Sequence, residues 1–134
     1  MDKLNRSELR KIIMTILYQK SIYETRKIEF TIDNLIKSSL EIDNEFVKEA
    51  IYGIITYQKE IDNAINKHLN DWTIDRLGYT DQAILRLATY ELLYTDTPEV
   101  VSINEAIELA KQYSDDAVTK MINATLDKIY HSKA

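Results

Sequence analysis

Three basic side chains near the N-terminus have the types and spacing best suited to a chemical task. At 100° per residue, Lys3, Arg6 and Arg10 fall within roughly a 60° arc beside the apolar face of a predicted helix. Arginine presents a fork of N–H donors that matches phosphate oxygens, and a tyrosine such as Tyr18 can stack on an unpaired base. These residues indicate nucleic-acid contact. The alternative is a basic helix end that is merely solvated.

The distribution of charge favours a local anion site over a diffuse one. The whole chain has a formal net charge of −5. Residues 1–27 nevertheless hold seven Lys or Arg against three Asp or Glu, so the remainder is strongly acidic. An acidic body with a basic end disfavours a general nucleic-acid coat and favours one localised contact.

Residues that perform catalysis or hold metals lack partners at the required spacing. The chain has no cysteine, which excludes disulfides, thiolate metal sites and thiol catalysis. Neither His68 nor His131 has a second histidine at ligand spacing, and the Glu-x-x-His signature of di-iron bundles is absent. The two glycines cannot form a phosphate-binding loop. The sequence therefore predicts no enzymatic activity, no metal and no cofactor.

The glutamates in the C-terminal half have a structural interpretation as well as a catalytic one. Paired carboxylates such as Glu91, Glu105 and Glu108 are able to perform acid–base work. However, Ser102 and Glu105 form an S-x-x-E pattern, which predicts a capping box at the start of a helix. Glu108 and Lys111 have the spacing of an ordinary solvated pair. The structural interpretation is favoured.

Apolar residues at helical spacing predict an all-α fold. Two glycines and one proline are too few for the turns that strands require. Helices are expected at about 6–23 and 32–40, from Asp43 or Asn44 through Ile65, briefly within 70–80, at 81–94 after a Thr80 cap, at 102–113, and from Ser114 or Asp115 to about Ile129. Gly53, inside the long third helix, marks either a close helix approach or a tolerated interior glycine. A compact bundle of six or seven helices, with one domain over residues 1–134, is expected.

Three collinear blocks in the C-terminal half resemble the NusB family. Residues 81–92, DQAILRLATYEL, are similar to the pattern D-R/K-A-I/V-L-R-x-A-x-Y-E-L. Residues 98–111, PEVVSINEAIELAK, are similar to P-x-x-V-x-I-N-E-A-V/I-E-L-A-K, and residues 120–129, KMINATLDKI, to K-F-V/I-N-G-V-L-D-x-I. The N-terminal stretch ending in Leu17-Tyr18 loosely matches A-R-x-x-x-x-Q-x-L-Y. Because order and spacing hold across nearly the whole chain, the sequence is identified as a member of the NusB family of bacterial transcription antitermination factors.

This resemblance implies both a fold and a function. The family fold consists of two small helical subdomains. Family members bind the single-stranded boxA element of nascent ribosomal RNA together with the ribosomal protein NusE, in an antitermination complex on RNA polymerase. The positions carried over as RNA-binding are Arg6, Arg10, Tyr18, Lys120 and Met121, with Lys3 added from its charge alone. Those carried over as partner-binding are Tyr18, Asp81 and Met121.

The sequence departs from the family pattern at several positions of the quoted blocks and leaves alternatives open. Gln82 stands where a basic residue is usual, Met121 replaces phenylalanine, and Ala124 replaces glycine. One alternative is a NusB-like accessory domain that serves an RNA methyltransferase, and another is an adaptor that binds only protein. Monomer and homodimer both remain open. The absence of a long apolar run and of a signal-peptide pattern predicts a cytoplasmic location.

Overall fold

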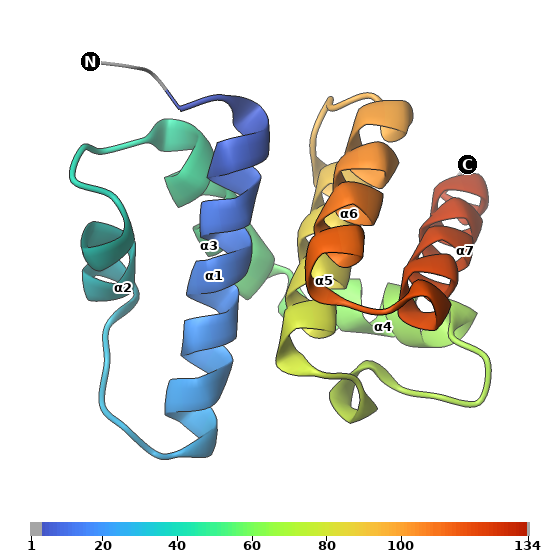
Figure 1. Ribbon diagram of the computed structural model, residues 1–134, viewed down its shortest axis with the longest axis horizontal. Coiled ribbons are helices and arrows are strands. Elements are labelled where there is room, and N and C mark those ends of the chain that lie inside the picture. Colours follow the sequence, from blue (N-terminus) through green and yellow to red (C-terminus); the bar gives the residue numbers. More distant parts are fainter. Residues whose placement is uncertain (1–3, 134) are drawn as a thin grey trace.

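Helices make up all the regular secondary structure of residues 4–133, the part of the chain that the computed structural model describes (Figure 1). There are seven α-helices and one short 3-10 helix in these residues. Their bounds are α1 Arg6–Thr25, α2 Ile32–Ser39, α3 Glu45–Thr56, α4 Gln58–His68, η1 Ile74–Arg76, α5 Tyr79–Tyr94, α6 Glu99–Tyr113 and α7 Asp116–Ser132. The all-α prediction is confirmed.

Polar side chains fix where several helices begin. Asn5 caps α1 by accepting a hydrogen bond from the backbone N–H of Glu8 at 2.8 Å, and the Glu8 carboxylate accepts from the Asn5 backbone N–H. The side chains of Asn44 and Asp115 cap α3 and α7 by accepting from the backbone N–H groups of Val47 and Val118, which decides between the two candidates that the sequence offers at each start. Each cap satisfies an N–H group that has no partner inside its helix.

The helices form two groups that meet along α1 and α5. In Figure 1 the helices α1, α2 and α3 lie on one side, and α4 to α7 lie on the other. Helix α1 packs antiparallel to α5, because Arg10 near its start contacts Glu91 near the end of α5, and Thr25 at its end contacts Tyr79. One apolar cluster runs through both groups, with Ile13 and Ile16 fully buried on the α1 side.

Gly53 allows the two groups to approach closely, which decides between the two interpretations of this glycine. A Cβ atom at position 53 would lie 2.7 Å from Cζ of Tyr90, well inside van der Waals contact. The Tyr90 ring of α5 therefore lies directly against the backbone of α3. Burial, together with the nearby carboxylate of Glu49, raises the pKa of Tyr90 above its usual value.

Two details of the predicted helices are wrong. The long third helix is two helices, α3 and α4, because the backbone of Tyr57 leaves the helical region at φ −105° and ψ 16°. Its ring stacks on that of Tyr94, with centroids 4.2 Å apart. Thr80 does not cap α5, which begins at Tyr79, two residues before the predicted start, with Gly78 at the N-cap position.

Candidate functional site

The N-terminal end of α1 presents one exposed cation on an aromatic ring. Arg6 is exposed, and its guanidinium carbon lies 4.1 Å from the centroid of the Phe46 ring on α3. A stacked arginine keeps the N–H groups at its edges available for phosphate oxygens. Arg6 therefore lies where the sequence places it, on the surface. Lys3 falls outside the described residues.

Arg10, in contrast, is buried, and the expectation that it belongs to an exposed basic arc is wrong. Only 4% of its surface is exposed. Its Nε and Nη2 atoms donate to the Glu91 carboxylate at 3.0 and 2.9 Å, and its Nη1 lies 3.8 Å from Glu105. Arg10 lies at the edge of the apolar face of α1. The residue pattern of α1 alone could not predict its burial, because the carboxylates that pair with Arg10 come from α5 and α6.

The expected capping box at Ser102 is also wrong. Helix α6 begins at Glu99, immediately after Pro98, so Ser102 lies inside the helix. Its hydroxyl is buried and has no hydrogen-bond partner among the described residues. Glu105 instead accepts a hydrogen bond of 2.7 Å from the Ser7 hydroxyl on α1. The carboxylates of this region therefore tie α5 and α6 to the start of α1.

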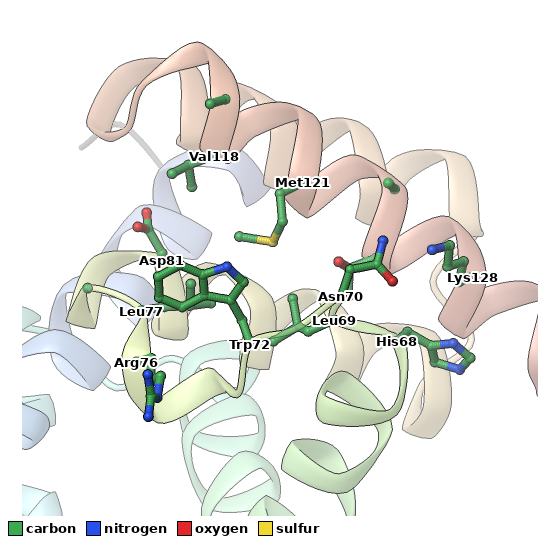
Figure 2. A pocket seen from close by; sticks show the side chains of 14 residues that line it. His68, Leu69, Asn70, Trp72, Arg76, Leu77, Asp81, Val118, Met121 and Lys128 are labelled. Carbon is green, nitrogen blue, oxygen red and sulfur yellow. The ribbon is translucent and has the colours of Figure 1, made fainter.

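An open cleft between α7 and the segment that joins α4 to α5 has a volume of about 540 Å³ (Figure 2). This volume is in the range of small-ligand sites. The cleft is lined mostly by apolar side chains, with cations at its margin. The lining residues are His68, Leu69, Asn70, Trp72, Arg76, Leu77, Gly78, Asp81, Ala117, Val118, Met121, Ala124, Thr125 and Lys128.

Trp72 and Met121 face each other across this cleft. The indole of Trp72 lies beneath the Met121 side chain in Figure 2, and 54% of Trp72 is exposed. An exposed aromatic ring beside a flexible thioether provides a surface on which a planar group can stack. The sequence gives only a weak signal for Trp72, namely the single tryptophan of the chain within a short polar connection.

The cleft unites two of the predicted site residues and leaves the others outside. Asp81 and Met121 both line it, and Asp81 accepts a hydrogen bond from the Ser114 hydroxyl. Lys120 is exposed on α7 next to Met121, although it does not line the cleft. Tyr18 is exposed on α1, two turns beyond Lys11. The predicted residues thus form two areas, the start of α1 and the cleft, with Tyr18 on α1 outside both.

Neither histidine lies in an arrangement typical of a metal centre. His68 makes a hydrogen bond of 3.2 Å with the Ser132 hydroxyl, and His131 lies 3.3 Å from Asp127. Within residues 4–133, no three His, Asp or Glu side chains converge as metal ligands would. None of the helices in that range combines the length and hydropathy needed to span a membrane.

The fold and these two areas define an all-helical binding module with a basic helix end and an aromatic cleft. The sequence model of the NusB family matches residues 7–131. Transcription antitermination protein NusB of Macrococcus caseolyticus (strain JCSC5402) is 40% identical over 133 residues, which cover 98% of this chain and 100% of that protein. The chain belongs to the NusB family.

Solved structures agree with this assignment. A structure of T. maritima NusB has a TM-score of 0.84 at 35% sequence identity, and the match covers 99% of this chain and 95% of that one. A crystal structure of the antitermination factors NusB and NusE in complex with dsRNA contains a chain that matches with a TM-score of 0.80 at 28% identity. That match covers 95% of this chain and 96% of the other. The predicted NusB-like fold is thereby confirmed.

Proposed function

We propose that this chain is a transcription antitermination factor that binds boxA-type ribosomal RNA together with the ribosomal protein NusE, in a complex on RNA polymerase. The observation that carries the proposal is the match, over nearly the whole chain, to a crystal structure that contains NusB, NusE and dsRNA. The chain's role is to bind and position these partners rather than to catalyse a reaction. Since the relatives described above are antitermination proteins, an accessory role beside an RNA methyltransferase is not favoured.

The RNA contacts are assigned to the basic end of α1 and to the α7 side of the cleft. Arg6, with Lys3 preceding it, supplies cations for phosphate oxygens. Lys120 and Met121 provide a second cation and a stacking surface. Each of these two areas carries a cation, which locally offsets the repulsion that a molecule of net charge −5 exerts on phosphate. Tyr18, which is exposed on α1, adds an aromatic ring that is able to stack on a base.

The NusE contacts are assigned to Tyr18, Asp81 and Met121. Asp81 lies at the start of α5, the end of that helix which meets the C-terminal end of α1. Met121 lines the cleft beside Asp81, so one partner surface is able to adjoin the RNA contacts. If RNA and NusE share this region, each strengthens the binding of the other by the same factor, as linkage requires.

Measuring the affinity for RNA with and without NusE tests this function. The probe is a short fluorescent boxA-type RNA, compared with a scrambled RNA of equal length and with the same sequence as a duplex. We expect weak binding by the free chain, tighter binding with saturating NusE, and preference for the single strand.

Tyr18→Asp is expected to weaken NusE binding and, through it, RNA binding by the complex. RNA affinity that NusE leaves unchanged would remove the cooperative mechanism, and NusE binding without any RNA binding would indicate a protein-only adaptor.

A further inference from the structure

The ion pair between Arg10 and Glu91 is a buried charged group to which the proposed function assigns no role. Three donor–acceptor contacts of 2.9 to 3.2 Å join the guanidinium to the carboxylate, and both side chains are almost fully buried. Paired N–H donors that point at both oxygens fix the orientation of the two groups as well as their distance. The pair therefore sets how α1 is rotated and placed against α5.

The same pair reaches the elements that surround the start of α1. The Arg10 guanidinium lies 5.4 Å from the centroid of the Phe46 ring, the ring on which Arg6 stacks. Its Nη1 approaches Glu105, which also accepts a hydrogen bond from Ser7. Helices α1, α3, α5 and α6 therefore converge on Arg10, one helical turn from the exposed Arg6.

The charges at this point hold the start of α1 in place. Arg10 pairs with one buried carboxylate, Glu91, and lies beside a second, Glu105. Without either member of the Arg10–Glu91 pair, the other would be left buried without its partner, and the first turns of α1 would lose the contact that fixes them against α5.

We infer that Arg10 is a positioning residue for RNA binding. Through its pair with Glu91 it holds the first turns of α1, and therefore Arg6, in place over two carboxylates, and it does not touch the RNA. This inference rests on the proposed function. It differs from a direct phosphate contact in one testable respect: the role of Arg10 depends on Glu91.

The experiment measures the affinity of folded variants for the boxA-type RNA in the presence of NusE. The variants are Arg10→Gln, Glu91→Gln and Arg10→Lys, and Lys20→Gln serves as a control that removes one cation from the far end of α1. Circular dichroism at the assay temperature gives the folded fraction of each variant. We expect each of the three to weaken RNA binding about tenfold, in the usual range of coupling between sites. Lys20→Gln is expected to leave the affinity unchanged.

Other results separate the competing roles. If Arg10 touches phosphate directly, Glu91→Gln leaves RNA affinity unchanged or raises it because the cation is released, and Arg10→Lys retains most of the affinity. If the pair only stabilises the fold, the melting temperature falls while the affinity of the folded fraction stays constant. Either result overturns the inference and leaves the proposed function intact. Absence of RNA binding by the unaltered chain with NusE present would overturn both. Should Glu91→Gln fail to fold, Arg10→Lys, which keeps the charge and loses the fork, decides between the roles.

Discussion

Arg6 on α1 and Phe46 on α3 form a cation–π contact, with 4.1 Å between the guanidinium carbon and the ring centroid. The contact holds an otherwise solvated arginine at a fixed place on the surface without using its N–H donors. A long side chain that is ordered before binding loses less entropy when it meets a phosphate. The Arg6 side chain is therefore already ordered, with its N–H donors available, before it meets RNA.

Replacing Arg6 tests this directly. Arg6→Gln is expected to weaken RNA binding and to flatten the log–log dependence of affinity on salt by about 0.7, the contribution of one phosphate contact with a single strand. The free energy of unfolding should fall by no more than about 1 kcal/mol, because the side chain is exposed and its ring contact is weak. RNA titrations over a range of salt concentrations give the slope, and urea unfolding gives the stability. Weaker binding with an unchanged slope would show that Arg6 acts through folding.

A second prediction contrasts a serine inside a helix with a true helix cap. Ser102→Ala should leave the free energy of unfolding nearly unchanged, because the Ser102 hydroxyl lies inside α6 and has no partner among the described residues. Asp115→Ala should cost about 1 kcal/mol, because the Asp115 carboxylate accepts from the Val118 N–H at the start of α7. Urea unfolding of both variants in parallel makes the comparison. A loss at position 102 as large as that at position 115 would restore the capping interpretation of Ser102.

The cleft yields a third prediction, which uses the single tryptophan as a reporter. Trp72 is the only tryptophan of the chain, so fluorescence excited at wavelengths that its tyrosines do not absorb reports on the cleft. Met121→Phe should place an aromatic ring opposite Trp72 and strengthen RNA binding by about 1 kcal/mol, the low end of stacking energies. Met121→Leu, which keeps a similar apolar volume without a ring, is the matched control and should bring no gain. If RNA binding leaves the Trp72 emission unchanged, the cleft is not part of the RNA surface.

The close packing of Gly53 against Tyr90 leads to a fourth prediction. Gly53→Ala normally stabilises a helix interior by about 1 kcal/mol. Here the added Cβ would overlap the Tyr90 ring, so we expect a net loss of about 1–3 kcal/mol in the free energy of unfolding. In a Tyr90→Leu background the same change should cost much less, since the ring is gone. Thermal unfolding of the four proteins of this cycle measures the coupling, and additive effects would argue against the contact.

Local patterns predict the helices because their causes lie close together in the sequence. The spacing of Leu9, Ile13 and Leu17 identifies the buried face of α1, and Asn44 and Asp115 identify the starts of α3 and α7. The break at Tyr57 escapes this reasoning. The apolar stripe keeps its phase from Ile54 in α3 to Ile61 and Ile65 in α4, so periodicity continues through a single residue that leaves the helix.

The site is less predictable because its contacts join distant parts of the chain. Arg10 and Glu91 are 81 residues apart, and nothing near either residue indicates the other. A helical wheel places Arg10 beside the apolar stripe, but whether such a border residue is solvated or buried depends on the neighbouring helix. Arg6 escapes this ambiguity because it precedes the region that α5 covers. Trp72 and Lys128 likewise line one cleft only because α7 folds back over the connection between α4 and α5.

The antiparallel packing of α1 on α5 also has a consequence for synthesis on the ribosome. Helix α1 is made first, and α2 and α3 are the next helices to pack on it, but α5, which packs along most of its length, is complete only at Tyr94. Until then Leu9, Ile13 and Leu17 belong to a nascent chain whose core is unfinished. Closing a loop of this length costs entropy before any contact is gained, which slows the docking of α5 on α1 relative to a bundle of sequential neighbours. Part of the apolar face of α1 therefore stays uncovered until α5 has emerged, and this interval is when the nascent chain most needs protection from aggregation.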